Sequence, residues 1–242
     1  MKFTIITVSY NEERCIAETI QSVIEQEYDN IEYLIIDGNS SDRTIEIAEK
    51  LAQEAKCDIK IYSEDDFGIY NAMNRGITRA TGDFTIFMNA GDSFWNRMVL
   101  SDIASQINEN GEAIYYGQAY LMKNGKCKGV KELSNFGKSE HDALMKGYMP
   151  VHQSIAVPTV LLKRHYFNEE YKIRADYDWL IRAYKEGIRF VNMGFPVCKY
   201  DCSGLSSRAS YKKILKAETL MIRRKVYPLL GRIYELRNQW KI

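Results

Sequence analysis

The first hundred residues show two kinds of hydrophobic pattern that take turns along the chain. Short apolar runs rich in β-branched residues are typical of strands covered on both faces, and longer segments place apolar residues at helical spacing. The runs predict strands at residues 3–8, 33–36, 59–62 and 84–88, with helices at 16–25, 44–55 and 69–79 between them. Strands that are separated by single helices pair in parallel through right-handed crossovers. The pattern therefore predicts an α/β fold with a mostly parallel central sheet and helices on both faces.

Beyond residue 92 the pattern is mixed. It predicts helices at 100–108 and 176–185 and strands at 113–117, 119–122 and 190–193. The last segment, 211–240, has a helical pattern that Pro228 and Gly231 divide. The expected organisation is one domain over residues 1–204, in halves 1–100 and 101–204, and a helical tail over 205–242.

The charge of the chain is unevenly distributed. The net charge is +1, which excludes a nucleic-acid-binding surface that extends over the whole protein. Residues 205–242 nevertheless contain ten Lys or Arg and two Glu, a net +8, and leave the remainder at −7. The tail is therefore basic and amphipathic, and two interpretations stay open: it lies on an anionic membrane surface, or it packs on the body of the protein or on a partner subunit.

The cysteines and the first residues indicate the compartment. The five cysteines are scattered without a CxxC pair, as in proteins that keep reduced thiols. The first predicted strand begins at residue 3 with no signal sequence before it, and no apolar stretch approaches the ~20 residues of a transmembrane helix. We expect a cytoplasmic protein, peripheral at the inner face of the membrane if the tail binds lipid.

A polar cluster follows each of the first four predicted strands. The clusters occupy residues 7–11, 36–44, 64–76 and 89–92. Turn formation and helix capping explain any single cluster of this kind. Four clusters at the carboxyl ends of parallel strands, however, meet at one edge of the sheet, where polar side chains and helix N-termini suit a ligand that bears ribose and phosphates.

Asp92 ends the last of these clusters. A carboxylate at a strand end is suited to hold Mg²⁺ or Mn²⁺ while diphosphate oxygens complete the coordination. Capping of the next helix is the alternative explanation for a lone strand-end aspartate. The neighbouring clusters favour the metal site.

Taken together, the four clusters resemble the motifs of the family 2 glycosyltransferases, above all the bacterial branch that builds polysaccharides and lipid-linked oligosaccharides. The resemblance extends over about residues 1–200. It implies the GT-A fold, in which a Rossmann-like nucleotide-sugar half precedes a smaller, mixed acceptor-side half. It also implies a hexosyltransferase that inverts the anomeric centre, with Mn²⁺ or Mg²⁺ as cofactor. The implied partners are a nucleotide-sugar donor, most of all a UDP-sugar, a glycan or lipid-linked acceptor, and a second copy of the chain if the protein is a homo-oligomer.

The resemblance assigns roles to the residues that match the family motifs. Asp92 matches the metal-binding acid of a D-x-D-like motif. Asp37 lies in the base-binding turn, whereas Asp66 and Arg75 lie in the segment that closes over the nucleotide. The residues implied in nucleotide binding are Val8, Tyr10, Asn11, Asp37, Asp66, Arg75, Asn89 and Ala90.

Two positions depart from the family pattern. Many relatives carry two consecutive acids where this chain has Asp37 and Gly38, so the acid credited with reading uracil is missing and the nucleobase stays open. Relatives also often carry two acids where Gly91 and Asp92 stand. Asp92 is expected to retain the metal, and a ribose contact is either lost or supplied by Asn89.

The acceptor side requires a base, because sugar hydroxyls are very weak acids. Asp176 and Asp178 are the candidates, and the resemblance implies Asp176 as the general base, just before the acceptor-side helix. It places His152 in the donor or acceptor pocket, since a similar His-Gln pair occurs in the family, and Arg182 faces the same site. Asp178, the second candidate base, is expected in this pocket as well. Helix capping and a favourable first-turn charge are the alternative explanation for both aspartates, and a structural role is the alternative for His152.

Two other functions remain open from the sequence. A sugar nucleotidyltransferase shares the sheet and the metal but carries a Gly-rich basic loop after its first strand, where this chain has Ser-Tyr-Asn-Glu-Glu. A non-catalytic sugar-nucleotide or glycan-binding subunit would be indicated by the loss of Asp92 or Asp176, and both are present.

Overall fold

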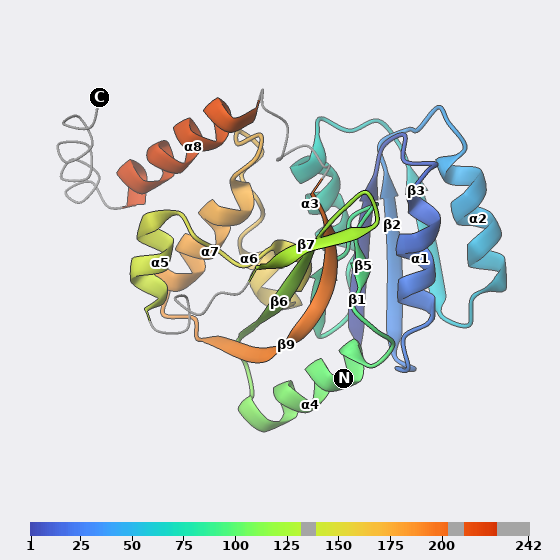
Figure 1. The fold of residues 1–242 in the computed structure, drawn as a ribbon, viewed down its shortest axis with the longest axis horizontal. Coiled ribbons are helices and arrows are strands. Elements are labelled where there is room, and N and C mark those ends of the chain that lie inside the picture. Colours follow the sequence, from blue (N-terminus) through green and yellow to red (C-terminus); the bar gives the residue numbers. More distant parts are fainter. Residues whose placement is uncertain (132–138, 203–210, 227–242) are drawn as a thin grey trace.

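A twisted sheet runs through the molecule, and helices lie on both of its faces (Figure 1). The computed structural model describes residues 1–131, 139–202 and 211–226 of the 242-residue chain. The strands are β1 (Phe3–Ser9), β2 (Ile31–Asp37), β3 (Asp58–Ser63), β4 (Phe84–Phe87), β5 (Ser93–Phe94), β6 (Ile114–Lys123), β7 (Lys126–Lys131), β8 (Ile155–Pro158) and β9 (Phe190–Asp201). The helices are α1 (Ile16–Ile24), α2 (Thr44–Glu54), α3 (Ile69–Arg79), α4 (Val99–Asn110), α5 (Glu140–Lys146), the short 3₁₀ helix η1 (His152–Ser154), α6 (Thr159–Arg164), α7 (Ala175–Lys185) and α8 (Tyr211–Val226).

The sheet has a parallel part and a mixed part. The strand order is β3-β2-β1-β4-β8-β6-β9-β5, and β7 pairs with β6. The neighbours β3, β2, β1 and β4 are all parallel. β8 is antiparallel to both β4 and β6, whereas β6 and β9 are parallel to each other. The α/β fold that the crossover pattern predicted is therefore confirmed, with the mixed region in the second half.

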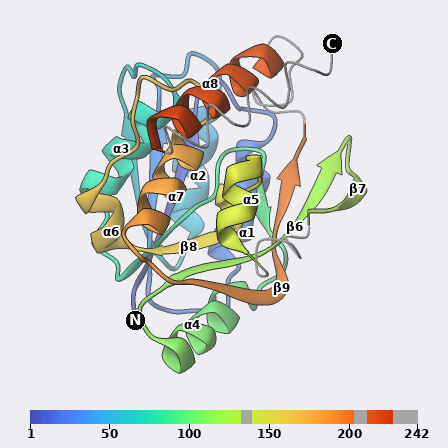
Figure 2. The ribbon, with the colours of Figure 1, turned by 90° about the vertical axis from the view of Figure 1, so that its left-hand side faces the viewer.

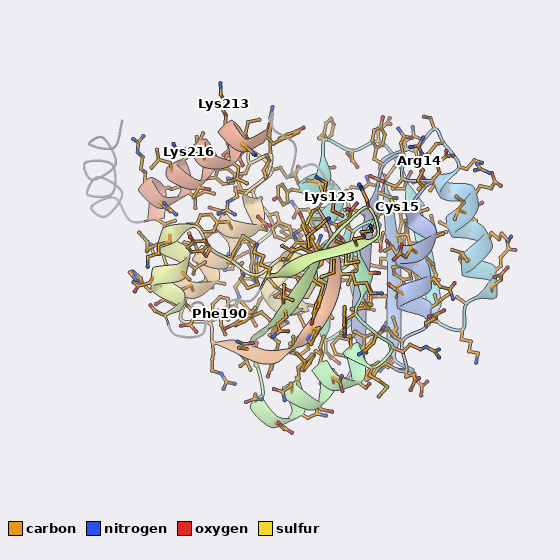
Figure 3. All side chains as sticks on the ribbon, in the orientation of Figure 1. Arg14, Cys15, Lys123, Phe190, Lys213 and Lys216 are labelled. Atoms are coloured by element: carbon orange, nitrogen blue, oxygen red, sulfur yellow. The ribbon has the colours of Figure 1, made fainter. Side chains whose placement is uncertain are left out.

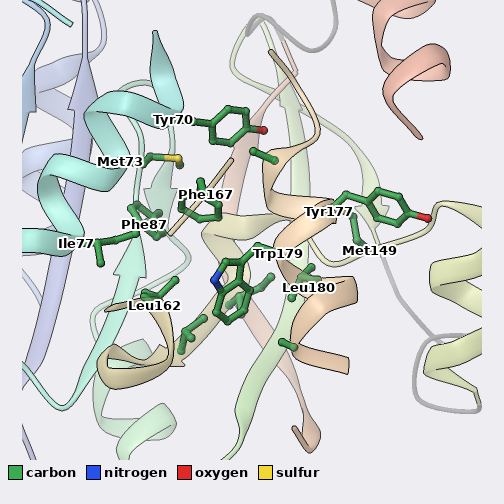
Figure 4. Close-up of a cluster of buried hydrophobic side chains, with 14 of the residues drawn as sticks. Tyr70, Met73, Ile77, Phe87, Met149, Leu162, Phe167, Tyr177, Trp179 and Leu180 are labelled. Carbon is green, nitrogen blue, oxygen red and sulfur yellow. The ribbon is translucent and has the colours of Figure 1, made fainter. Parts of the chain in front are cut away.

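Alternate residues of the central strands enter two hydrophobic layers. Every residue of β1 and β2 is buried, as the continuous apolar runs predicted. Ile5 belongs to the layer that contains α1 and α4, whereas Ile6 belongs to the layer that contains α3, α6 and α7. Figure 4 shows the second layer, in which Trp179 of α7 packs near Phe167 and Leu180. Trp179 is only 3% exposed, so its side chain is part of the hydrophobic core.

The second half differs in detail from the predicted elements. The two strands predicted on either side of Gln118 form the single strand β6. Gly117 allows β9 to approach this strand, because a Cβ at Gly117 would lie 2.6 Å from Val197 Cγ2. β9 continues to Asp201, well beyond its predicted end. β5, β7, β8, α5 and α6 were not predicted, since they are too short or too polar to leave a periodic signature.

The described part of the basic tail, α8, packs on the body of the protein. Figure 2 shows α8 beside α7, which it contacts directly. Ile222 is fully buried, and Glu218, Thr219 and Arg223 are less than 10% exposed. The inner face of α8 therefore packs on the body of the protein, as the second interpretation predicted. Contact of its outer face with a membrane stays a prediction.

The remaining predictions about the tail lie outside the described residues. These are the boundary at 204/205 and the division of the helix at Pro228 and Gly231. Within the described ranges, none of the helices combines the length and the apolar character needed to cross a membrane.

A buried carboxylate joins the beginning of β2 to its neighbours. Glu32 is 1% exposed and accepts hydrogen bonds from Thr4 Oγ1 at 2.8 Å and from the Thr81 N–H at 2.7 Å. Lys60 Nζ and Lys2 Nζ lie 3.5 and 3.6 Å from its Oε1. Burial raises the pKa of Glu32, but the bonds from Thr81 and Thr4 and the charge of Lys2 outweigh this effect, so that the pKa lies below its usual value.

We expect Glu32→Gln to lower the free energy of unfolding at pH 7 by about 2 kcal/mol, because hydrogen bonds to a charged acceptor are lost. A carboxylate whose pKa is lowered by folding stabilises the protein above its unfolded pKa, and this contribution is lost as the pH falls through the folded pKa. Urea unfolding at pH 7 and at pH 3.5 should therefore show the difference between variant and wild type narrowing in acid. Glu49→Gln, on the exposed face of α2, is the matched control. A difference that stays constant with pH would contradict this account.

Candidate active site

The carboxyl ends of β1, β2 and β4 meet at one edge of the sheet. Ser9 at the end of β1 pairs with Asp37 at the end of β2. On the other side of β1, the backbone N–H of Ala90 donates to the Val8 carbonyl oxygen at 3.2 Å. The structure thus brings together the polar clusters that follow these three strands, as their parallel arrangement predicted.

An aromatic ring and a carboxylate lie next to Gly38. The Tyr10 side chain is 62% exposed. A Cβ at Gly38 would lie 2.5 Å from Asp66 Oδ2 and 3.3 Å from Tyr10 Cδ2. The other oxygen of Asp66 accepts a hydrogen bond from the Gly68 N–H at 2.9 Å. The Asp66 carboxylate therefore occupies the space that a side chain at position 38 would enter, beside an exposed ring.

Asp37 lies beneath this surface. Its side chain is fully buried and accepts hydrogen bonds from Ser9 Oγ at 2.9 Å, from Ser63 Oγ at 2.8 Å and from the Ser40 N–H at 2.7 Å. Ser40 Oγ in turn accepts from the N–H of Asn11, whose φ is 55°. Asp37 therefore ties together the ends of β1, β2 and β3, and it supports the predicted base-binding turn from the inside.

Arg75 holds the segment that follows β3. Its guanidinium lies 2.5 Å from Glu64 Oε1 and donates to the Glu64 carbonyl oxygen at 3.1 Å. Glu64 and Asp66 belong to the same segment. The positive charge of Arg75 is thus close to the nucleotide-side segment but is engaged by Glu64.

Asp92 is a buried carboxylate that is held from two sides. Gln153 Nε2 donates to its Oδ2, and the Asp201 N–H donates to its Oδ1 at 2.8 Å. Thr19 Oγ1 donates to its backbone carbonyl oxygen at 2.7 Å. Burial raises the pKa of Asp92 to about 8; the hydrogen bonds from the Asp201 N–H and from the Gln153 side chain oppose the shift, and the charges of Asp201 and Glu12 add to it.

The surroundings of Asp92 fit a divalent cation that is shared with a substrate. The described residues contain no group of three or more His, Cys, Asp or Glu that could hold a metal by themselves. Mg²⁺, however, is commonly held by one or two carboxylates together with substrate phosphates, and Mn²⁺ prefers similar oxygen ligands. Asp92 is such a carboxylate, and the charge of Asp201 acts on it. Gln153 Oε1 is buried without a hydrogen-bond partner in the described part of the chain, so an oxygen atom is available next to this carboxylate.

Asp176, the second residue of α7, is mostly buried, with 14% of its side chain exposed. Its Oδ1 accepts hydrogen bonds from the Tyr177 N–H at 2.8 Å and from the Tyr70 hydroxyl at 3.3 Å. Its Oδ2 lies 3.4 Å from His152 Nδ1. Burial raises the pKa of Asp176, but His152, Arg174 and the Tyr177 N–H outweigh it, and the pKa lies below its usual value. The carboxylate is therefore ionised at neutral pH.

His152 connects Asp176 to the end of β4. Asn89 Nδ2 lies 2.8 Å from His152 Nε2, and in this amide orientation the imidazole hydrogen is on Nδ1, facing Asp176. Asn89 Oδ1 is buried and has no hydrogen-bond partner among the residues that the structure describes. The next residue, Gln153, donates to Asp92. Two consecutive residues therefore contact the predicted base, Asp176, and the predicted metal-binding acid, Asp92.

Asp178 and Arg182 form a separate pair on α7. Arg182 Nε donates to Asp178 Oδ2 at 2.9 Å, and Arg182 also donates to the Tyr166 carbonyl oxygen. Two residues along a helix correspond to a rotation of about 200°, so Asp178 points away from Asp176. The structure therefore places His152 next to Asp176, whereas Asp178 and its partner Arg182 form their contact on another side of α7.

Four side chains of the site were not among the predicted residues, namely Tyr70, Lys131, Gln153 and Asp201. The sequence offers a signal for Gln153, which follows His152, and for Tyr70, which lies in the cluster after the third strand. Asp201 and Lys131 carry no local signal, because they end strands that approach the site from the second half. Burial lowers the pKa of Lys131, and the charge of Asp176 opposes this shift.

A parallel sheet that gathers polar turns, buried aspartates and an exposed ring at its carboxyl edge is typical of α/β proteins that bind nucleotides. The chain matches the family described as glycosyl transferase family 2 over residues 4–212. The protein belongs to this family and is a glycosyltransferase. The resemblance of the motifs is thereby confirmed, and the nucleotidyltransferase and non-catalytic alternatives are set aside.

The curated relatives include glycosyltransferases of bacterial polysaccharide and glycolipid synthesis. The amylovoran biosynthesis glycosyltransferase AmsB of Erwinia amylovora is 31% identical over 213 residues, which are 83% of this chain and 69% of AmsB. The PGL/p-HBAD biosynthesis glycosyltransferase Rv2957 of Mycobacterium tuberculosis (strain ATCC 25618 / H37Rv) is 28% identical over 218 residues, or 88% of this chain and 82% of that protein.

Solved structures with the same fold carry nucleotide sugars. Residues 1–349 of Staphylococcus aureus TarS in complex with UDP-GlcNAc superpose with a TM-score of 0.73 at 22% identity, covering 93% of this chain and 65% of the TarS chain. This chain thus spans just under two thirds of that structure. The mannosyltransferase PcManGT of Pyrobaculum calidifontis, in complex with GDP-Man and Mn²⁺, has a TM-score of 0.64 at 18% identity. This match covers 94% of this chain and 72% of the PcManGT chain. At these identities the likeness establishes the GT-A fold.

Proposed function

We propose that the protein transfers a sugar from a UDP-sugar to a hydroxyl of a glycan or lipid-linked acceptor and inverts the anomeric centre. The observation that carries this proposal is the pair His152 and Gln153, of which the first contacts Asp176 and the second contacts Asp92. Adjacent residues thus hold a carboxylate suited to accept a proton near one suited to face a diphosphate. Displacement at an anomeric carbon needs both groups, one for the nucleophile and one for the leaving group.

Asp176 is the general base of this reaction. Its lowered pKa keeps it ionised, and His152 and Tyr70 fix the orientation of its oxygens. The acceptor oxygen attacks the anomeric carbon from the face opposite the diphosphate, and its proton passes to Asp176 as the new C–O bond forms. The bond from the anomeric carbon to the diphosphate breaks, the nucleoside diphosphate leaves, and Asp176 then releases the proton to water.

Asp92 faces the diphosphate. A divalent cation, when bound, neutralises the diphosphate and stabilises the charge that develops as it leaves. Asp92, with Gln153 Oε1 and the Asp201 carboxylate as additional oxygens, would hold it. The support for this assignment is the buried carboxylate of Asp92 beside Gln153 Oε1, which has no hydrogen-bond partner within the described residues. Burial is the main cause of the raised pKa of Asp92, and a cation would relieve the repulsion that the charges of Asp201 and Glu12 add to it.

The uracil ring binds beside Gly38. The exposed Tyr10 ring offers a stacking surface, and Asp66 offers a carboxylate oxygen within contact distance of position 38. A carboxylate only accepts hydrogen bonds, so it selects a ring nitrogen that carries a hydrogen, such as N3 of uracil, and rejects N3 of cytosine. Asp66 then replaces the acid that is missing after Asp37.

The acceptor is a growing glycan. The names of the relatives, which refer to amylovoran, PGL/p-HBAD and poly(ribitol-phosphate), support a polymeric or lipid-linked acceptor. A lipid-linked acceptor places the reaction at the cytoplasmic face of a membrane. Lys213 and Lys216, which point outward from α8 (Figure 3), would face the anionic headgroups there.

The role of Asp176 is tested with Asp176→Asn, which keeps the size of the side chain but cannot accept the proton. We expect transfer to fall by about 100-fold or more, while the affinity for UDP stays within about two-fold of wild type. The measurements are UDP release from UDP-glucose, UDP-galactose and UDP-N-acetylglucosamine with a panel of oligosaccharide and lipid-linked acceptors, and calorimetric titration with UDP. Asp102→Asn, in the exposed first turn of α4, is the control. Wild-type turnover by Asp176→Asn would refute the assignment.

The role of Asp92 is tested with Asp92→Asn, which preserves the acceptor for the Asp201 N–H. We expect Mn²⁺ to tighten UDP binding to the wild type by about ten-fold or more and to leave binding by the variant unchanged, since a neutral amide is a poor ligand for Mn²⁺. Calorimetric titrations with UDP, with and without Mn²⁺, give both values. An enhancement that survives the substitution would show that the cation is held elsewhere.

The role of Asp66 is tested with Asp66→Asn. The amide can donate to N3 of cytosine, so we expect the ratio of the Kd for CDP to the Kd for UDP to fall by about ten-fold. Asp65→Asn changes the same charge on the adjacent, exposed residue and should leave the ratio unchanged. If both variants keep the wild-type ratio, Asp66 does not read the base.

A further inference from the structure

A carboxylate of α8 binds the turn that leads into α7. Glu218, which is 8% exposed, accepts hydrogen bonds from three consecutive backbone N–H groups. The Lys172 N–H donates to Oε1 at 2.7 Å, and the N–H groups of Ile173 and Arg174 both donate to Oε2 at 3.0 Å. Hydrogen bonds to a charged acceptor are the strong ones, and here three of them fix one short stretch of backbone.

The turn needs an external partner because α7 provides none of its own. α7 begins at Ala175, and the residue before it, Arg174, makes no side-chain capping hydrogen bond. Asp176 bonds only the N–H of the next residue, Tyr177, in this first turn. Glu218 therefore fixes the backbone of residues 172–174, which precede the first residue of α7 and which the helix itself leaves unsupported.

Further contacts from α8 hold the residues on either side of Asp176. Arg174 Nε donates to Thr219 Oγ1 at 3.1 Å, and Arg174 also donates to the Gly147 carbonyl oxygen at 2.8 Å. The Arg174 guanidinium lies over the Tyr177 ring, 4.2 Å from its centroid. On the other side, Arg223 Nε donates to the Tyr177 hydroxyl at 3.3 Å. Glu218 is thus the centre of an interface between α8 and the beginning of α7.

We infer that Glu218 is a positioning residue for the transfer reaction: it fixes residues 172–174 and thereby holds Asp176 against His152. This inference rests on the proposed role of Asp176 as the base. A base must lie within hydrogen-bond reach of the proton that it accepts, and small displacements of a reacting group reduce the rate strongly. Glu218 touches no substrate in this role and acts only through Asp176.

The first test is Glu218→Gln in the full chain. The amide keeps the length of the side chain but loses the charge and one accepting oxygen, so we expect kcat to fall by about ten-fold while the Kd for UDP stays within about two-fold. Hydrogen exchange at Lys172, Ile173 and Arg174 should accelerate by about ten-fold or more. Met221→Gln, at an exposed position of the same helix, should change none of these values. Unchanged kcat in Glu218→Gln, or a parallel loss of UDP binding, would overturn the inference.

The second test is a double-mutant cycle with Asp176→Asn. If Glu218 acts through Asp176, adding Glu218→Gln to Asp176→Asn should lower the residual transfer by less than about two-fold. A further ten-fold loss in the double variant would show that Glu218 affects transfer by another route, and the inference would be wrong. Failure of the proposed base is seen separately, since Asp176→Asn alone would then retain wild-type transfer. Thermal unfolding of all three variants establishes that each is folded at the assay temperature.

Discussion

The burial of Asp92 is the constraint on which the site depends. A carboxylate that is removed from water must receive hydrogen bonds, and the donors to Asp92 are the Gln153 side chain and the Asp201 N–H. Both donors belong to the second half of the chain, whereas Asp92 follows β4 in the first half. The acid is therefore satisfied only when β8 and β9 have joined the parallel strands in one sheet, so the same contacts complete the fold and the site.

A continuous chain of contacts follows from this arrangement. Asn89 at the end of β4 contacts His152, His152 contacts Asp176, and Asp176 accepts from Tyr70 at the beginning of α3. Asn89 follows β4, the other three members belong to η1, α7 and α3, and η1 connects this chain of contacts to Asp92 through Gln153. The distance between the proton acceptor and the diphosphate side is thus set by packed secondary structure, which is the condition for holding reacting groups in a productive geometry.

The sequence predicted the parallel half of the fold and the meeting of its polar strand ends, because both follow from local periodicity and from the geometry of parallel crossovers. It did not predict β8, since four buried residues carry no period, nor the continuity of β6 through Gly117, which depends on the approach of β9. The contacts of Asp92 with Gln153 and Asp201, and of residues 172–174 with Glu218, join distant parts of the chain, and a single sequence holds no signal for such pairs. Gly38 was interpreted as the loss of an acid, and only the structure places the Asp66 carboxylate beside it. The carboxylate of Asp37 is enclosed by serine side chains. The direct contact with the nucleotide that was predicted for it therefore stays a prediction.

The short strand β8 also has a consequence for folding. It pairs with β4 on one side and with β6 on the other, and it follows directly after His152 and Gln153. The pairing of β8 with β4 joins residues 84–86 to residues 156–158, and the pairing of β1 with β4 joins residues 3–6 to residues 84–87, so both are pairings of high contact order that form slowly. The residues assigned to transfer come together only through such long-range pairings, so recovery of activity after dilution from denaturant reports the completion of the sheet.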